Sequence, residues 1–199
     1  MAEGKTYTLD NLPDVPVYTG KATEYDPIYD GEIYQAELLK VELRDKLAIY
    51  VDPAHGENGK YNISFEFAIL NDGEFYGRRL WSTASLSLKP EGKIGPTVLY
   101  KIVTKMLKSE LTWDDCASYA PTIKILMGNL EELVGRQIKL AIENVKKDDG
   151  KIKSTIKTFS EVKTDLPAFD AERSKKIGED ARAKKAATEE VVIKEPLPF

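Results

Sequence analysis

Residues 61–88 read YNISFEFAILNDGEFYGRRLWSTASLSL, and this stretch decides the fold. Its first part alternates apolar and polar side chains with a period of two, which is typical of an antiparallel strand with one buried face. An Asn-Asp-Gly connection at residues 71–73 interrupts the alternation, and a second alternating run starts at Arg79. Two alternating runs around such a connection predict a β-hairpin.

The second run of this hairpin carries an aromatic residue on its polar face. Arg79 and Trp81 alternate there with the apolar residues of the other face, and their neighbours are small and polar. Nucleobases stack on tryptophan rings, and an adjacent arginine supplies positive charge. We therefore expect Arg79 and Trp81 to bind single-stranded DNA, with Tyr76 in the connection as a further candidate. The alternative is that Trp81 is buried beneath helices or the N-terminal arm.

Residues 31–43, GEIYQAELLKVEL, predict a bent strand before the hairpin. The apolar phase shifts by one residue between Leu38 and Leu39, and such a shift indicates a β-bulge. Small closed barrels contain a strand of this kind, which is shared between their two halves.

The rest of the chain predicts a helical insert and a second hairpin. Apolar residues recur at helical spacing from Pro96 to Leu107, and residues 137–159 alternate around an Asp-Gly turn. A bent strand, a hairpin, a helical insert and a hairpin together predict a mainly β protein. We expect a five-stranded OB-fold barrel with the helical insert between strands 3 and 4. An open α+β sheet with the helices on one face is the alternative.

Both ends of the chain lack the periodicity of the centre. Prolines interrupt residues 1–30, which we expect to form an extended N-terminal arm. Residues 31–165 then form the OB-fold domain, and residues 166–199, rich in Ala, Lys and Glu, form a flexible C-terminal tail.

Composition excludes several kinds of site. The chain has 199 residues, a net charge of −4, one histidine and one cysteine, Cys116. It therefore has no intrachain disulfide and no zinc site of the usual nitrogen and sulfur type. No arrangement of residues suggests catalysis, so we expect a non-enzymatic protein without catalytic residues, metal or cofactor. No apolar run reaches membrane-spanning length, and the N-terminus lacks a signal peptide, so we expect a cytoplasmic protein without a membrane partner.

Positive charge gathers in the last hairpin. Residues 136–157 hold seven bases and three acids, a local net charge of +4, although residues 1–32 hold seven acids and two bases. We expect the hairpin lysines to contact DNA phosphates, and we place Lys151, Lys153 and Lys157 on the side of Phe159. The alternative is a solvated hairpin whose lysines protect a sheet edge. The candidate lysines are Lys139, Lys146, Lys147, Lys151, Lys153 and Lys157.

Three runs resemble a family of bacteriophage single-stranded-DNA-binding proteins with an OB-fold, often described as of unknown function. They are GEIYQAEL at 31–38, ISFEFAILNDGEFYGRRLW at 63–81 and LEELVGRQIKLAIE at 130–143. The chain end, with Glu195, Pro198 and Phe199, is similar to the acidic tail of bacterial and phage single-stranded-DNA-binding proteins, which ends in proline and phenylalanine.

This resemblance implies binding of single-stranded DNA with little sequence preference, during replication or recombination in the cytoplasm of an infected host cell. It also implies that Glu195, Pro198 and Phe199 recruit replication or recombination proteins. The sequence is compatible with an oligomer. The alternative is a protein-binding OB-fold accessory module of a replication or recombination complex that does not itself bind DNA.

Overall fold

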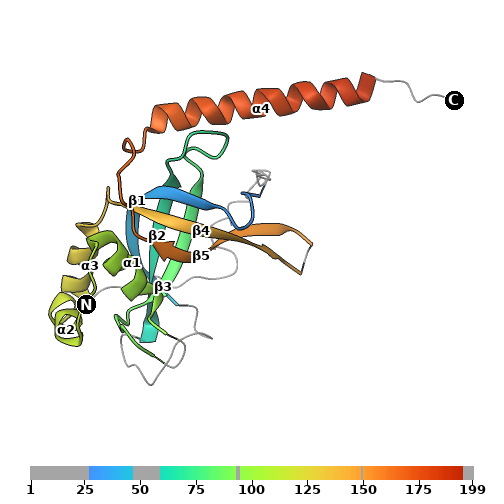
Figure 1. Ribbon diagram of the computed structural model, residues 1–199. Helices are drawn as coiled ribbons and strands as arrows, with labels where there is room; N and C mark the ends of the chain where they lie inside the picture. Colours follow the sequence, from blue (N-terminus) through green and yellow to red (C-terminus); the bar gives the residue numbers. More distant parts are fainter. Residues whose placement is uncertain (1–26, 47–58, 93–94, 149, 195–199) are drawn as a thin grey trace, which may run out of the picture.

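The computed structural model describes residues 27–46, 59–92, 95–148 and 150–194. Their framework is one antiparallel sheet with the strand order β3-β2-β1-β4-β5 (Figure 1). The prediction of a mainly β chain is confirmed, and so are the two predicted hairpins. The strands are β1 (Ile33–Asp45), β2 (Tyr61–Ile69), β3 (Arg79–Ser85), β4 (Gln137–Lys146) and β5 (Ile152–Ser160).

Four helices accompany the sheet. In chain order α1 (Val98–Leu107), α2 (Trp113–Tyr119) and α3 (Ile123–Glu131) follow β3 and precede β4, and α4 (Ala171–Lys194) follows β5. Figure 1 shows α1–α3 grouped at one side of the sheet, whereas α4 runs along its upper end and extends beyond it. No helix in the described parts of the chain is long and apolar enough to cross a lipid bilayer.

The predicted helix after Pro96 is confirmed as α1. Thr97 caps its N-terminus, because the Thr97 hydroxyl accepts a hydrogen bond from the amide of Tyr100 at 3.3 Å. The apolar side of α1 is buried, including Leu99 and Ile102, and the helix lies against β3, β4 and β5.

The predicted β-bulge in β1 is confirmed. Leu38 pairs with Phe67, but Lys40 pairs with Glu66, so the register shifts between them. Because side chains alternate along a strand, the extra residue lets both Leu38 and Val41 face the core. The same shift turns Lys40 to the opposite, outer face of the sheet.

The core lies between the inner face of the sheet and the helices. Phe65 and Phe67 of β2 are fully buried and stack with ring centroids 6.4 Å apart. Ile138 and Leu140 of β4 are also fully buried on this face. Each such side chain contributes roughly 1.5–3 kcal/mol through removal of its apolar surface from water.

Hydrogen bonding leaves β3 and β5 as the two edges of the sheet, which is therefore open. The two edge strands nevertheless approach each other.

The last residues of the predicted N-terminal arm pack against the domain. The Ile28 side chain is fully buried, its amide donates to Ser154 Oγ at 2.9 Å, and its carbonyl accepts from Asn144 Nδ2 at 2.9 Å. Residues 28–30 therefore pack against the β4–β5 hairpin, whereas residues 1–26 of the predicted arm lie outside the described residues.

Candidate nucleic-acid interface

Trp81 lies on the outer face of β3, where 56% of the residue's surface is exposed. Its strand neighbours Leu80 and Ala84 are buried on the inner face. The structure therefore does not bury Trp81 beneath the helices. Across the sheet, Trp81 pairs with Glu66 of β2, and Glu66 pairs with Lys40 of β1.

Lys40 and Arg44 are two cations on this face that the sequence prediction missed. Both contact Glu42, at 2.5 Å and 2.7 Å respectively. Hydrogen bonds from Lys40 and Arg44 lower the pKa of the Glu42 carboxyl. These three side chains stand on the Trp81 face only because the bulge inverts the strand, and the apolar phase shift in the sequence was the signal that could have identified them.

Arg79 also lies on the outer face, but its guanidinium is engaged within the protein. Its Nη1 atom is 3.6 Å from Glu66, and its guanidinium carbon lies 4.5 Å from the ring centroid of Phe169. The Nη1 atom is buried and makes no hydrogen bond. The sequence did not predict that a distant residue would cover this arginine.

Tyr76 is buried in this structure, with only 5% of its surface exposed. The Phe169 ring stacks on the Tyr76 ring, with the two centroids 6.3 Å apart. The Arg173 guanidinium carbon lies 4.1 Å from the centroid of the Tyr76 ring. The Tyr76 hydroxyl accepts a hydrogen bond from the amide of Asp170 at 3.0 Å. As placed here, Tyr76 supports the C-terminal segment and does not offer its ring to a ligand.

The covering segment comprises residues 164–174, which we call the strap. It crosses the outer face at one end of β4, β1 and β3. Gln137 Nε2 donates to the carbonyl of Leu166 at 2.6 Å, and the Leu166 amide donates back to Gln137 Oε1 at 2.8 Å. The Phe169 amide donates to Glu37 Oε2 at 2.9 Å. The flexible tail predicted from residue 166 therefore begins, in this structure, as a segment bonded to the sheet, and the strap ends in the first turn of α4.

The lysines of the β4–β5 hairpin do not form one row. Lys139 is half-buried opposite Gln35, and Lys157 pairs with Glu143 at 3.2 Å. Lys153 of β5 pairs with Val145 of β4. The residue after Val145 in β4 is Lys146, which pairs with Ile152 of β5. Because neighbouring positions alternate, Lys146 and Lys153 point to opposite faces.

The predicted alignment of Lys151, Lys153 and Lys157 with Phe159 is wrong. A second register shift, between Ala141 and Ile142, breaks the alternation of β5. Phe159 therefore faces the core opposite Leu140. Lys147 and Lys151 flank the turn, where the Lys147 amide donates to the Lys151 carbonyl at 2.8 Å.

The remaining sequence predictions concern the chain end, metal binding and the single cysteine. Glu195, Pro198 and Phe199 lie outside the described residues. Within the described ranges, no group of three or more His, Cys, Asp and Glu side chains is placed to hold a metal ion. Cys116 is buried, and this burial raises the pKa of its thiol, with a smaller contribution from Asp115.

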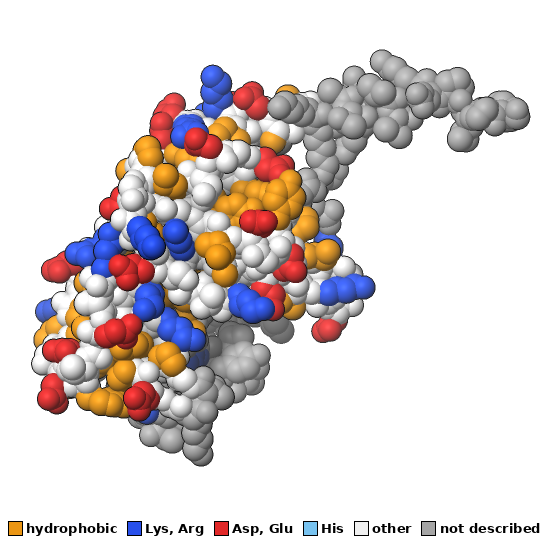
Figure 2. All heavy atoms as spheres, viewed as in Figure 1, with side chains coloured by type: hydrophobic (Ala, Val, Ile, Leu, Met, Phe, Trp, Pro, Cys, Tyr) orange, Lys and Arg blue, Asp and Glu red, His pale blue; other side chains and the backbone are white. Residues whose placement is uncertain are grey.

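Basic and acidic side chains are interspersed on the face of the molecule shown in Figure 2. The candidate interface is a small site around Trp81, where Lys40 and Arg44 lie close to the Glu42 carboxylate. Comparison of the chain with protein-family models, with curated proteins and with solved structures gave no match.

Proposed function

We propose that this protein binds single-stranded DNA on the outer face of β1–β3, with little sequence preference and without catalysis. The exposure of Trp81 on this sheet face carries the proposal. A large aromatic surface open to water is unfavourable for a free protein, and a nucleobase that stacks on the ring removes that surface from water. Stacking of this kind accepts any base, which accounts for the low sequence preference.

Lys40 and Arg44 supply the phosphate contacts of the proposed site. Both stand on the Trp81 face, and both share the carboxylate of Glu42. When DNA binds, Lys40 and Arg44 can leave Glu42 and pair with DNA phosphates. The free-energy cost is small, because an exposed ion pair contributes only about 0–1 kcal/mol. Release of counterions then makes the affinity fall as the salt concentration rises.

We further propose that the sheet is that of an OB-fold barrel. Three features support this: β1 pairs with both β2 and β4, β1 carries a bulge, and the edge strands β3 and β5 approach each other. In OB-folds the face of strands 2 and 3 binds oligonucleotides, and the proposed site occupies this face. Together with the sequence resemblance, the proposed fold supports a role in phage replication or recombination.

The test is a fluorescence titration of labelled oligo-dT at about 50 mM and then about 200 mM salt, the range over which phosphate contacts lose affinity. Trp81→Ala is expected to weaken binding by roughly 5- to 150-fold, which corresponds to about 1–3 kcal/mol for one stacked base. Trp113→Ala is the matched control, because Trp113 is 55% exposed but belongs to α2. Lys40→Gln is expected to remove about one phosphate contact and so to make the slope of log affinity against log salt concentration shallower by about one.

Two results would overturn the proposal. Absence of binding at the lower salt concentration would exclude DNA as the ligand. Equal affinities of the Trp81→Ala and Trp113→Ala variants would exclude stacking at the proposed face.

A protein-binding accessory module is the second candidate. It is favoured by the strap, because the outer face already holds a peptide segment through Glu37 and Gln137. On this reading a partner's chain, and not DNA, occupies the face around Trp81. The oligo-dT titration separates the two candidates. If DNA does not bind, the proposed tail contacts through Glu195, Pro198 and Phe199 would remain to be tested by partner recovery.

A further inference from the structure

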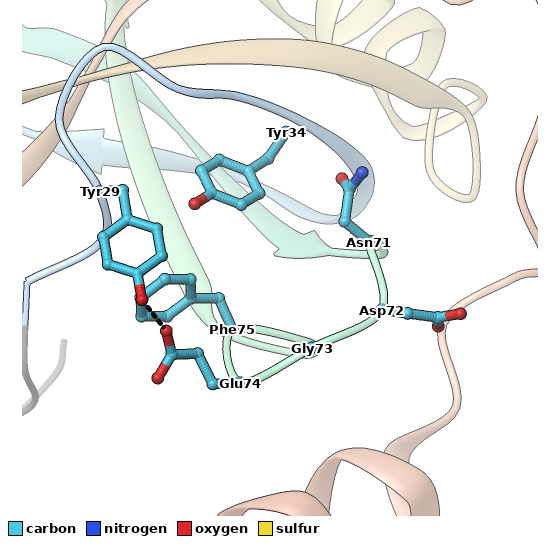
Figure 3. Close-up of a pocket in the computed structure, with 7 residues that line it drawn as sticks. All are labelled: Tyr29, Tyr34, Asn71, Asp72, Gly73, Glu74 and Phe75. Atoms are coloured by element: carbon cyan, nitrogen blue, oxygen red, sulfur yellow. Dashed lines mark hydrogen bonds between the residues drawn. The ribbon is translucent and has the colours of Figure 1, made fainter.

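A notch lined by aromatic rings lies at the end of the β2–β3 hairpin, and Trp81 is not among its lining residues. Tyr29 precedes β1, Tyr34 belongs to β1, and Phe75 belongs to the connection between β2 and β3 (Figure 3). Both tyrosines meet Phe75 edge to face, with ring centroids 5.1 Å and 6.0 Å apart. They enclose a cavity of about 190 Å³.

The notch is open to a ligand. Tyr29 is 60% exposed, and Tyr34 and Phe75 are only partly buried. In Figure 3 the Tyr34 hydroxyl points toward the space between the other two rings. Typical cofactor pockets enclose roughly 300–1,000 Å³, so this smaller cavity suits the end of one side chain.

Two acidic residues, Asp72 and Glu74, are among the residues that line the notch. Residues 27–34 and 70–77 contain four acids and no base. Glu74 accepts a hydrogen bond from the Tyr29 hydroxyl at 2.5 Å, and Asp72 pairs with Arg173 at the rim. In Figure 3 the Glu74 carboxylate lies beside the Tyr29 and Phe75 rings, whereas Asp72 points away.

Carboxylates contribute to the raised pKa values of both tyrosine hydroxyls. The hydrogen bond and charge of Glu74 raise the pKa of Tyr29. Burial raises the pKa of Tyr34, and the charges of Glu32 and Glu74 raise it further. A potential that opposes the tyrosinate anion favours a bound cation.

We propose that this notch binds the side chain of a lysine or arginine from a partner protein. The ring faces attract a cation through their quadrupoles, and the Glu74 carboxylate adds a charged acceptor. The same carboxylates repel phosphate, so the notch does not continue the proposed DNA site. The proposal goes beyond DNA binding, and it does not depend on it.

The test uses the full-length, ¹⁵N-labelled protein and amide chemical shifts. The probes are a short lysine-containing peptide and the same peptide with an acetylated lysine side chain, which removes the charge. The charged peptide is expected to shift the amides of Gly73, Glu74 and Phe75, and the acetylated peptide is not. Equal shifts from both peptides, or shifts confined to other residues, would overturn the proposal.

Two variants locate the binding energy. Glu74→Gln and Phe75→Leu are each expected to weaken peptide binding by about two- to fivefold, the worth of one exposed cation–π or charge contact. Glu161→Gln is the matched control, because it removes an exposed carboxylate after β5. Glu74→Gln keeps the side-chain volume, so its result stands even if Phe75→Leu unfolds the connection. Equal peptide affinity of Glu74→Gln and Glu161→Gln would refute the assignment.

Tetramethylammonium distinguishes a partner's side chain from a small free cation. The peptide is expected to bind more tightly than this ion, because it adds backbone contacts at the rim. If tetramethylammonium binds as tightly as the peptide, the assignment to a partner protein is wrong. Failure of the oligo-dT titration would leave this outcome unaffected, because the two experiments probe different residues.

Discussion

Substitution of Gly77 by alanine should release the strap from the sheet. A Cβ atom on Gly77 would lie 2.5 Å from the Cβ of Ser174 and 3.2 Å from Cε2 of Phe169. Carbon atoms in contact are separated by about 3.5–4.0 Å, so the first turn of α4 has to move by roughly 1 Å. A rotation of the Ser174 side chain cannot relieve this clash, because its Cβ is fixed to the backbone.

The contacts that hold the strap set the magnitude. The Tyr76–Phe169 ring pair is worth about 0.5–1.5 kcal/mol, and the Arg79–Phe169 contact about 0.5–1 kcal/mol. Their loss therefore raises the open fraction of the strap by roughly 5- to 70-fold. Gly77 also has φ +75°, and alanine in this left-handed region costs roughly 1–2 kcal/mol whether or not the strap is bound.

Hydrogen exchange measures the change in the open fraction of the strap. Denaturant unfolding measures the loss of global stability caused by alanine at a positive φ. The amides of Leu166, Phe169 and Asp170 are the reporters, because each donates to a side chain of the sheet or its connection. Their exchange should accelerate in Gly77→Ala. Ser174→Gly is the matched second change, because it removes the two nearest clashing atoms, the Oγ and Cβ of Ser174.

In the double variant, strap exchange should return toward that of Ser174→Gly alone, while the loss of global stability persists. Unchanged exchange of the three amides in Gly77→Ala would refute the close approach. An equally strong acceleration in the double variant would show that backbone strain, and not the Ser174 contact, releases the strap.

Three further predictions concern the core, the pH response and the chain end. Phe67→Ala should lower the free energy of unfolding by about 3–5 kcal/mol in urea, because the ring is fully buried. Burial, with a smaller contribution from Glu132, raises the pKa of Tyr119 to about 12 from 10.0. The neutral phenol is therefore favoured in the folded state, and stability should fall as the pH rises from 10 to 12; Tyr119→Phe should remove this step in alkaline unfolding curves. A chain ending at Ile193 should keep or gain DNA affinity in the oligo-dT titration and lose partner recovery, and unchanged recovery would contradict the tail proposal.

The two hairpins and the bent first strand were predictable because their signals are local. Alternation fixes which residues of β2 face the core, and the step from Leu38 to Leu39 marks the bulge. Trp81 could be placed on the outer face by the same alternation. The order of neighbouring residues along a strand is thus enough to predict which side chains are buried.

The strap could not be predicted in this way. It contacts the sheet mainly through its own backbone and through Gln35, Glu37 and Gln137, which are each only 8% exposed. Polar residues on an outer strand face look the same in a sequence whether water or a distant segment covers them. The sequence therefore predicts a ligand-binding role for Tyr76, although Phe169, far along the chain, covers it.

The two bulges explain why the proposed phosphate contacts move from the last hairpin to β1. Counting charges along the chain favours the hairpin, because seven bases lie within residues 136–157. A register shift beside Ile142 divides these lysines between two faces, whereas the shift after Leu38 turns Lys40 and Arg44 toward the face of Trp81. DNA contacts residues that share one face of the sheet, whether or not they are neighbours in the sequence. Lys40→Gln should therefore lower DNA affinity more than Lys146→Gln does. Oligo-dT titration of both variants decides this, and a larger effect of Lys146→Gln would return the site to the hairpin.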